Sequence, residues 1–239
     1  MVLAVLFAAA SGSAVISGLV GMAGGVTLLA ILTFYYPMHV IVPLHGATQF
    51  VSNLSRSYIL RRGIKWSVFR NFALGAPLGG VLAYFVLREI KHHESILVLI
   101  AGLLFYVALK PKKLPDIKLP DRGFVLLGWV AGFLGSLMGA TGPLLAPFFA
   151  REDISKEEIV ATKASCQIVV HLIKFPVFIG LAFPYDTYVS EILVMVIGVI
   201  IGTKIGTMLL DRLPRATFQK ILKTILFLTG VRVLYKVLA

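Results

Sequence analysis

Two stretches of the chain repeat one polar pattern whose residue types suit the binding of an anion. Each stretch places a basic or imidazole residue, then Gln four positions later, then Asn or His four later, then Arg or Lys three later. The sets are His45, Gln49, Asn53 and Arg56, and, 118 positions further on, Lys163, Gln167, His171 and Lys174. These steps fall on one face of a helix. Amide and cationic side chains on such a face can donate hydrogen bonds to a negatively charged ligand.

The surrounding sequence is too apolar for a water-soluble domain. Of its 239 residues 58% are hydrophobic and 14% are charged, and the mean hydropathy is +0.92. Soluble domains carry about 25% charged residues. The first 55 residues contain no Asp, Glu, Lys or Arg. We therefore expect an all-α polytopic membrane protein in a lipid bilayer.

Charge and cysteine content argue against several other classes of protein. The net charge is +12, but the basic residues lie mainly at the ends of apolar runs, as in cytoplasmic loops, and do not form a nucleic-acid footprint. The single cysteine, Cys166, excludes an intrachain disulfide and a Cys-rich metal site. We expect no cofactor, metal or nucleic acid. The apolar start lacks the positive region of a signal peptide, so we interpret it as the first membrane element.

The apolar runs predict two similar halves. Each half begins with a broken segment, interrupted at "GMAGG" in the first and at "GATGP" in the second, and continues with three spans near the roughly 20 residues needed to cross a bilayer. The first half is 1–110, a polar cytoplasmic linker is 111–122, and the second half is 123–239. The broken segments are 1–36 and 123–150; the spans lie near 40–60, 68–87, 95–110, 159–181, 189–210 and 217–237.

The two halves align as an internal repeat. An offset of 118 pairs Gly24 with Gly142 and Gln49 with Gln167. An offset of 123 pairs two glycines of the span at 68–87 with two glycines of the span at 189–210. Those glycines, four residues apart in "GAPLGG" and "GVIIGTKIG", predict close helix packing. They are Gly75 and Gly79 in the first half and Gly198 and Gly202 in the second.

Loop charges predict that the halves have opposite topologies. The loop after the first polar stripe is basic, whereas its counterpart "FPYDTYVSE" carries only Asp186 and Glu191 as charged residues. Because Arg and Lys mark cytoplasmic loops, the same loop is inside in one half and outside in the other. Both termini then lie outside. Each broken segment enters and returns on one side, either as two short spans or as a re-entrant hairpin.

Inverted repeats with paired broken segments indicate a secondary transporter whose substrate site lies near the midplane between the halves. A helix restarting at each break points free N–H groups inward, which suits an anion. All 11 acidic residues fall in predicted loops, and a cation path normally needs an acid within the spans. The alternative for the glycines is close packing, and for the polar stripe it is helix-to-helix hydrogen bonding and snorkelling.

The candidate substrate-binding residues come from the breaks, the stripe and its neighbours. They are Gly24, Gly25, Thr48, Gln49, Asn53, Arg56, Thr141, Gly142, Ser165, Cys166, Gln167, His171 and Lys174. His45 and Lys163 are expected to lie too close to the starts of their spans to reach the substrate. If protons are coupled, His171 is the mid-span side chain expected to titrate near neutral pH.

The sequence resembles the TauE/SafE family, which is named for the export of sulfite and organosulfonates. The resemblance rests on "GLVGMAGGVTLL", "GATQFVSNLSR", "GAPLGG" and the second-half copy, and it covers essentially the whole chain. It implies a bacterial or archaeal cytoplasmic-membrane protein with two repeated halves. It also implies export of sulfite, sulfoacetate or related sulfonates. The chain departs from the pattern at "GATGP" and at Cys166, which stands where the first half has Thr48.

Two other functions remain open at this level. One is an anion channel or an accessory membrane subunit, which sequence alone does not separate from a carrier. The other is a membrane redox enzyme with Cys166 as nucleophile beside His171 or Lys174, although Cys to His at i+5 leaves the shared helical face. Substrate identity, coupling ion, direction and assembly into a homo-oligomer also stay open. A nucleotide-binding motif is absent, which argues against direct ATP driving.

Overall fold

The computed structural model describes residues 2–20, 24–89, 119–149 and 155–209, with isolated positions 98, 101, 102, 105, 106, 109, 227, 231 and 235. All regular elements in these ranges are helical. They are α1 (Val2–Val20), α2 (Gly24–Leu32), α3 (Met38–Ile59), η1 (Arg61–Gly63), α4 (Trp66–Glu89), η2 (Asp121–Gly123), α6 (Phe124–Met138), α7 (Gly142–Phe149), α8 (Lys156–Gly180), η3 (Tyr185–Tyr188) and α9 (Val189–Met208).

Five helical segments are long and apolar enough to cross a membrane, which confirms the predicted polytopic all-α class. Helix α3 has 22 residues, but its polar stripe lowers its hydropathy and it is not among the five. The predicted spans at 95–110 and 217–237 fall largely outside the described residues.

Each broken segment is one long helix followed by a short one. Helices α1 and α6 have 19 and 15 residues, whereas α2 and α7 have 9 and 8. At 1.5 Å per residue, the short helices extend only about 12–14 Å, less than half of a bilayer core. In the second break, the chain turns at Gly139, whose φ of +84° is a conformation that favours glycine.

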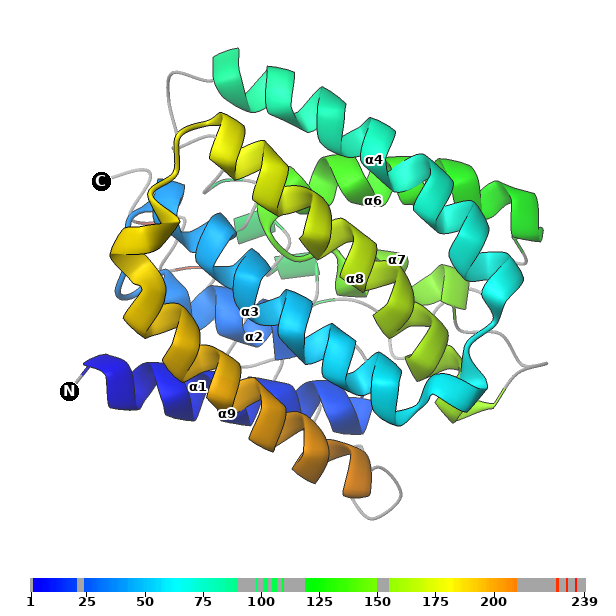
Figure 1. Cartoon of the computed structure of the whole chain (residues 1–239), viewed down its shortest axis with the longest axis horizontal. Coiled ribbons are helices and arrows are strands. Elements are labelled where there is room, and N and C mark those ends of the chain that lie inside the picture. Colours follow the sequence, from blue (N-terminus) through cyan, green and yellow to red (C-terminus); the bar gives the residue numbers. More distant parts are fainter. Residues whose placement is uncertain are drawn as a thin grey trace.

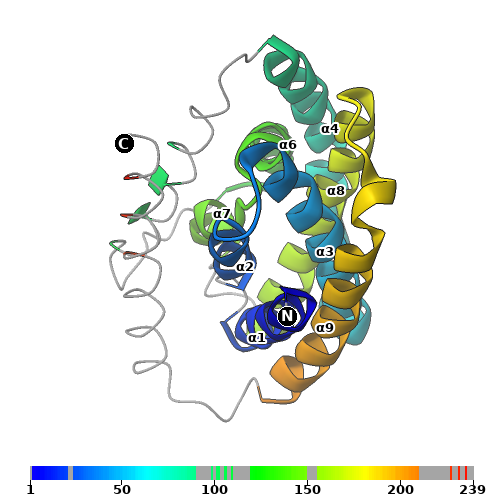
Figure 2. The ribbon, with the colours of Figure 1, turned by 90° about the vertical axis from the view of Figure 1, so that its left-hand side faces the viewer.

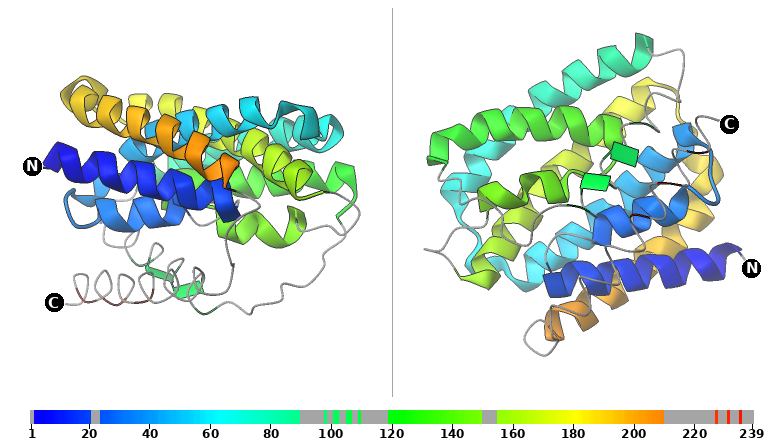
Figure 3. Two further views of the ribbon diagram at one scale, coloured as in Figure 1. Left: turned by 90° about the horizontal axis from the view of Figure 1, so that it is seen from below. Right: turned by 180° about the vertical axis from the view of Figure 1, so that it is seen from behind.

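The helices form a bundle in which the break helices pack across the halves. Helix α1 lies along α9, α4 lies along α6, and α3 lies beside α8 near the centre and runs in the opposite direction (Figure 1; Figure 2). The half-length helices α2 and α7 lie on one side of α3 and α8, as the views from below and behind show (Figure 3).

Glycines allow both cross-half contacts, and they do so at equivalent positions. A Cβ at Gly79 would overlap the carbonyl oxygen of Trp129, and a Cβ at Gly202 would overlap that of Ser11. The repeat offset of 123 pairs Gly79 with Gly202, and the offset of 118 pairs Ser11 with Trp129. The same two offsets relate the contact of Gly75 with Val125 to the contact of Gly198 with Phe7. The small-residue pattern therefore lets two backbones approach closely in each case.

The bundle has two ends. In Figure 1 α3 and α9 begin at the left, where α4 and α8 end; α4, α6 and α8 begin at the right, where α3 ends. We call the right-hand end, which contains η1, the η1 end, and the opposite one the η3 end. The polar stripes of α3 and α8 lie between them.

Candidate functional site

A small cavity lies where the two polar stripes meet the two helix breaks. Its volume available to the centre of a water molecule is about 10 Å³, which is room for about one water. Helices α1, α2, α3 and α8 and the break before α7 all contribute to it. The lining residues are Ser17, Gly25, Val26, His45, Gln49, Arg56, Ala140, Gly142, Gln167 and His171.

His45 occupies the centre of this arrangement, although its position in the sequence suggested the start of a span. Helix α3 begins seven residues earlier, at Met38, and the His45 side chain is fully buried. Its Nε2 lies 2.8 Å from the carbonyl oxygen of Gly25 at the start of α2. Its Nδ1 is buried and has no hydrogen-bond partner within the described part of the chain.

The rest of the first stripe forms a chain of hydrogen bonds along α3. Asn53 Nδ2 donates to the backbone carbonyl of Gln49 at 2.8 Å, and Arg56 Nη1 donates to Asn53 Oδ1 at 3.3 Å. Arg56 Nη2 also donates to Ser52 Oγ at 3.3 Å. The Arg56 side chain is 3% exposed, so it does not snorkel to the surface. Gln49 Nε2 and Arg56 Nε remain without partners among the described residues.

In the second stripe, Lys174 joins α8 to the break between α6 and α7. Its Nζ donates to the carbonyl of Gly139 and lies 3.1 Å from His171 Nδ1. Because an ammonium group only donates, His171 Nδ1 accepts and its remaining proton is on Nε2. The Lys174 stem lies against Gly46, where a Cβ would be 2.8 Å from Lys174 Cδ. Glycine at this position therefore makes room for the buried lysine.

Several candidate residues lie beside the cavity and face other helices. Thr48 Oγ1 donates to the Leu44 carbonyl at 2.9 Å and faces Met195 of α9. Ser165 Oγ lies 2.7 Å from Ser57 Oγ, and Cys166 packs in an apolar cluster. Thr48 and Cys166 each adjoin a stripe position and Ser165 lies two residues from one, and each residue turns a helix by about 100°. Their side chains therefore point away from the stripe.

The remaining break residues divide between packing and lining. A Cβ at Gly24 would overlap the backbone of Ser13, so Gly24 supports the contact between α1 and α2. Gly25 and Gly142 line the cavity, and Thr141 is buried beside it. Ser17 and Ala140, which the sequence did not indicate, also line it. Ser17 could have been found from its position one turn before the first break.

The charges at the site are positive. Arg56 and Lys174 are both buried, and none of the described residues that line the cavity is Asp or Glu. The described acids lie at helix ends or in 3₁₀ turns: Glu89, Asp121, Glu157, Glu158, Asp186 and Glu191. Two cations, the unpartnered donors of Gln49 and Arg56 and the lack of a carboxylate among the described lining residues form an environment suited to an anion.

Long apolar helices, paired helix breaks and a buried polar site between them are features of membrane transporters. A family model described as sulfite exporter TauE/SafE matches residues 5–233. The chain belongs to this family of multi-pass membrane transporters, whose description is that of an anion exporter. No curated protein and no solved structure matches the chain.

The environment of Cys166 does not support the redox-enzyme hypothesis. Cys166 is fully buried with Phe72 and Val170 in an apolar cluster, while His171 lines the cavity. A reactive thiol instead needs access and a stabilised thiolate. Family membership likewise favours transport.

Proposed function

We propose that the chain exports sulfite or a small sulfonate such as sulfoacetate by alternating access across a bacterial or archaeal cytoplasmic membrane. One observation carries the proposal. Three buried polar atoms without partners in the described part of the chain, His45 Nδ1, Gln49 Nε2 and Arg56 Nε, belong to residues that line one cavity. Such atoms usually mark a site that water or a ligand satisfies. With Lys174 nearby, that ligand is an anion.

The matched glycine contacts support two halves of opposite topology. The contact of α4 with α6 and that of α1 with α9 involve residues that the repeat offsets pair with each other. Such correspondence is expected if one rotation relates the halves. A site on that axis, with one polar stripe from each half, is the arrangement known from inverted-repeat transporters.

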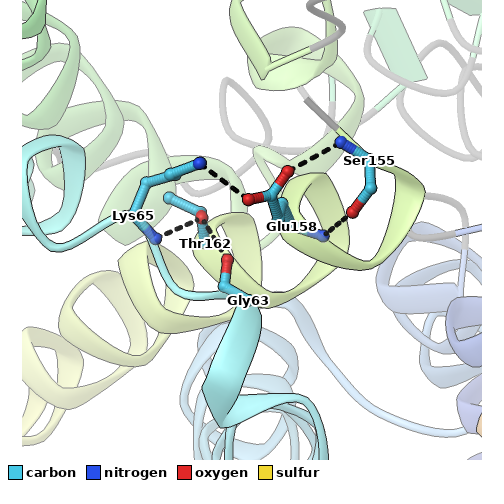
Figure 4. A network of polar contacts seen from close by, with 5 residues as sticks. All are labelled: Gly63, Lys65, Ser155, Glu158 and Thr162. Carbon is cyan, nitrogen blue, oxygen red and sulfur yellow. Dashed lines mark hydrogen bonds and ion pairs between the residues drawn. The ribbon is translucent and has the colours of Figure 1, made fainter. Parts of the chain in front are cut away.

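A polar clamp closes the η1 end (Figure 4). Lys65 Nζ lies 2.7 Å from Glu158 Oε1, and the Lys65 backbone N–H donates to Thr162 Oγ1 at 2.9 Å. Thr162 Oγ1 in turn donates to the Gly63 carbonyl at 3.4 Å. Ser155 and Glu158 form a capping box that fixes the start of α8. The clamp thus joins the loop after α3 to the start of α8.

The η3 end is hollowed by a vestibule of about 540 Å³ between α3, α4, α6 and α8. Along α3, along α6 with the break that follows it, and along α8, the vestibule comes within about one helical turn of the central site. Val42, Leu137 and Phe178 line the vestibule, whereas His45, Ala140 and Lys174 follow or precede them by three or four residues. A site closed at one end and approached by a vestibule at the other fits one state of an alternating-access cycle.

Loop charges orient this state. The η1 end carries Arg61, Arg62, Lys65 and Arg70, whereas η3 and the start of α9 carry Asp186 and Glu191. The positive-inside rule then places the η1 end in the cytoplasm and the vestibule outside. The central cavity has room for about one water. Binding of an anion of several heavy atoms must therefore widen it.

Reconstitution into liposomes tests the proposal. We expect saturable uptake of sulfite or sulfoacetate, stimulated by the same anion on the opposite side, and little transport of chloride. Gln49→Leu and Gln167→Leu should abolish it. Asn71→Leu, which removes an amide bonded to Ser67 of its own helix, is the matched control and should retain it. Ohmic single-channel currents would support a channel instead of a carrier. Uptake at the wild-type level in Gln49→Leu would remove that residue from the site.

A further inference from the structure

We propose that His45 takes up a proton when the anion binds, so that one proton enters the site with each anion. This inference rests on the proposed anion transport and assigns coupling to a residue other than His171. It follows from the hydrogen bonds of the two imidazoles and from the charges that face them.

The Gly25 carbonyl determines which nitrogen of neutral His45 carries the proton. A carbonyl oxygen only accepts, so the 2.8 Å contact requires a proton on Nε2. Neutral His45 then has a lone pair on Nδ1, a buried atom that accepts no hydrogen bond from the described residues and lies beside the Gly139 backbone. This atom faces Gly139, where a Cβ would lie 3.7 Å from it. A lone pair repels an anion; a proton on Nδ1 converts the same atom into a donor.

His171 differs because Lys174 already occupies one of its nitrogens. With Nδ1 accepting from the ammonium group at 3.1 Å, neutral His171 has its proton on Nε2. It can donate to an anion without changing its charge. The two rings contact each other edge to face with centroids 5.8 Å apart. His45 is thus the imidazole whose donor capacity depends on gaining a proton.

The groups around His45 make this proton dependent on the anion. Lys174 and His171 face it from α8, and Arg56 shares its cavity from α3. The breaks contribute the Gly25 carbonyl and the Gly139 backbone, α1 contributes Ser17, and α9 presents Met195 and Thr203 to α3. None of these described groups is a carboxylate. A further positive charge beside Lys174 is unfavourable until an anion offsets it, and by linkage the proton then strengthens anion binding.

The first test measures protons bound per anion on the purified protein in detergent. Methanesulfonate is the probe, because it stays ionised throughout the neutral range whereas sulfite itself takes up a proton there. Calorimetric titration in two buffers of different ionisation enthalpy gives the proton count. Wild type should take up close to one proton per anion at mildly acidic pH, and its Kd should rise about tenfold per pH unit there.

Two variants separate His45 from its neighbour. His45→Gln keeps an amide that can donate to Gly25 but cannot titrate, so proton uptake should fall to near zero and Kd should become independent of pH. His171→Gln should bind more weakly yet retain the wild-type proton count. Unchanged proton uptake in His45→Gln would overturn the inference.

Further outcomes distinguish this inference from the proposed function. If His45→Gln does not fold, the wild-type proton count decides, and a count near zero overturns the inference. Wild type that transports methanesulfonate or sulfite with no proton uptake keeps the transport proposal and removes only the coupling. Folded wild type that neither binds nor transports any of the tested anions overturns both.

Discussion

Lys174 Nζ donates to the backbone carbonyl of Gly139, so the second polar stripe is tied directly to the second helix break. The lysine is 1% exposed and is one of the largest fully buried side chains in the described ranges. It also lies between the vestibule and the central cavity, because Phe178 and His171 flank it along α8. A single side chain therefore connects the site, the break and the path toward the η3 end.

Replacing this lysine tests its contribution to anion binding. Lys174→Met keeps the approximate length of the side chain and removes the charge, so we expect kcat/KM for anion uptake to fall about 10- to 100-fold, the range of one charged hydrogen bond. Thermal stability should change little or rise, since a buried charge is costly. Lys204→Met, an exposed lysine of α9, is the control and should transport normally. Wild-type uptake by Lys174→Met would contradict this assignment.

The clamp at the η1 end should control access from that side. Glu158→Gln removes the ion pair with Lys65 but can keep the capping box, which accepts Gln as well as Glu. The pair is partly exposed, at 42% and 29%, so its loss should be a small effect that shifts the closed population at most about fivefold. Overall stability should hardly change.

Labelling can detect this shift. Ser57→Cys in a Cys166→Ala background places one thiol at a buried position near the η1 end. Its reaction with a maleimide should be up to several-fold faster when Glu158→Gln is added. The charge exchange Lys65→Glu with Glu158→Lys should restore the slow rate. Equal rates in all three proteins would show that the clamp does not govern access.

The cross-half glycine contacts should be needed for stability. Gly79→Val would place side-chain atoms against the Trp129 carbonyl, and we expect a loss of about 2 kcal/mol or more, visible as a thermal midpoint lower by several degrees. Gly12→Ala is the control, because nothing lies within 4 Å of a Cβ there. It should raise stability by up to about 1 kcal/mol, since alanine is the better helix former. A stable Gly79→Val protein would contradict the close approach.

Cys166 should be dispensable for transport. Its thiol packs among apolar side chains and does not line the central cavity, so Cys166→Ala should keep uptake within about twofold of wild type and cost about 1 kcal/mol of stability. Reconstituted flux and thermal unfolding measure the two effects. Loss of uptake with normal stability would return the cysteine to the functional site.

Much of the fold was predictable because it depends on local pattern. Apolar runs define the long helices, and the helical spacing of Gln49 with Arg56, and of Gln167 with His171, places each pair on one face. Glycines at the breaks indicated where helices end. The half-length of α2 and α7 was not predictable, because an apolar run shows where a helix can form and not whether it crosses.

The site details that sequence missed depend on contacts between distant segments. The sequence excluded His45 from the predicted site because it lies near the expected start of its span. Helix α3 begins early enough to bury His45 beside Gly25. Lys65 lies in the connection before α4 and Glu158 in the first turn of α8, and spacing in the sequence does not specify a charge pair between such segments. The roles of the two histidines differ only through the carbonyl and the ammonium group that face them.

The exchange of break helices between the halves has a consequence for how the chain assembles. Helix α1 needs α9 and α6 needs α4, so half a chain alone would leave both glycine-lined faces uncovered. The two halves together cover these faces for each other. The fold thus contains one kind of interface twice, each time between a break helix of one half and a glycine-bearing helix of the other. Co-expression of the two halves as separate polypeptides should accordingly rebuild the bundle, whereas either half alone should be degraded.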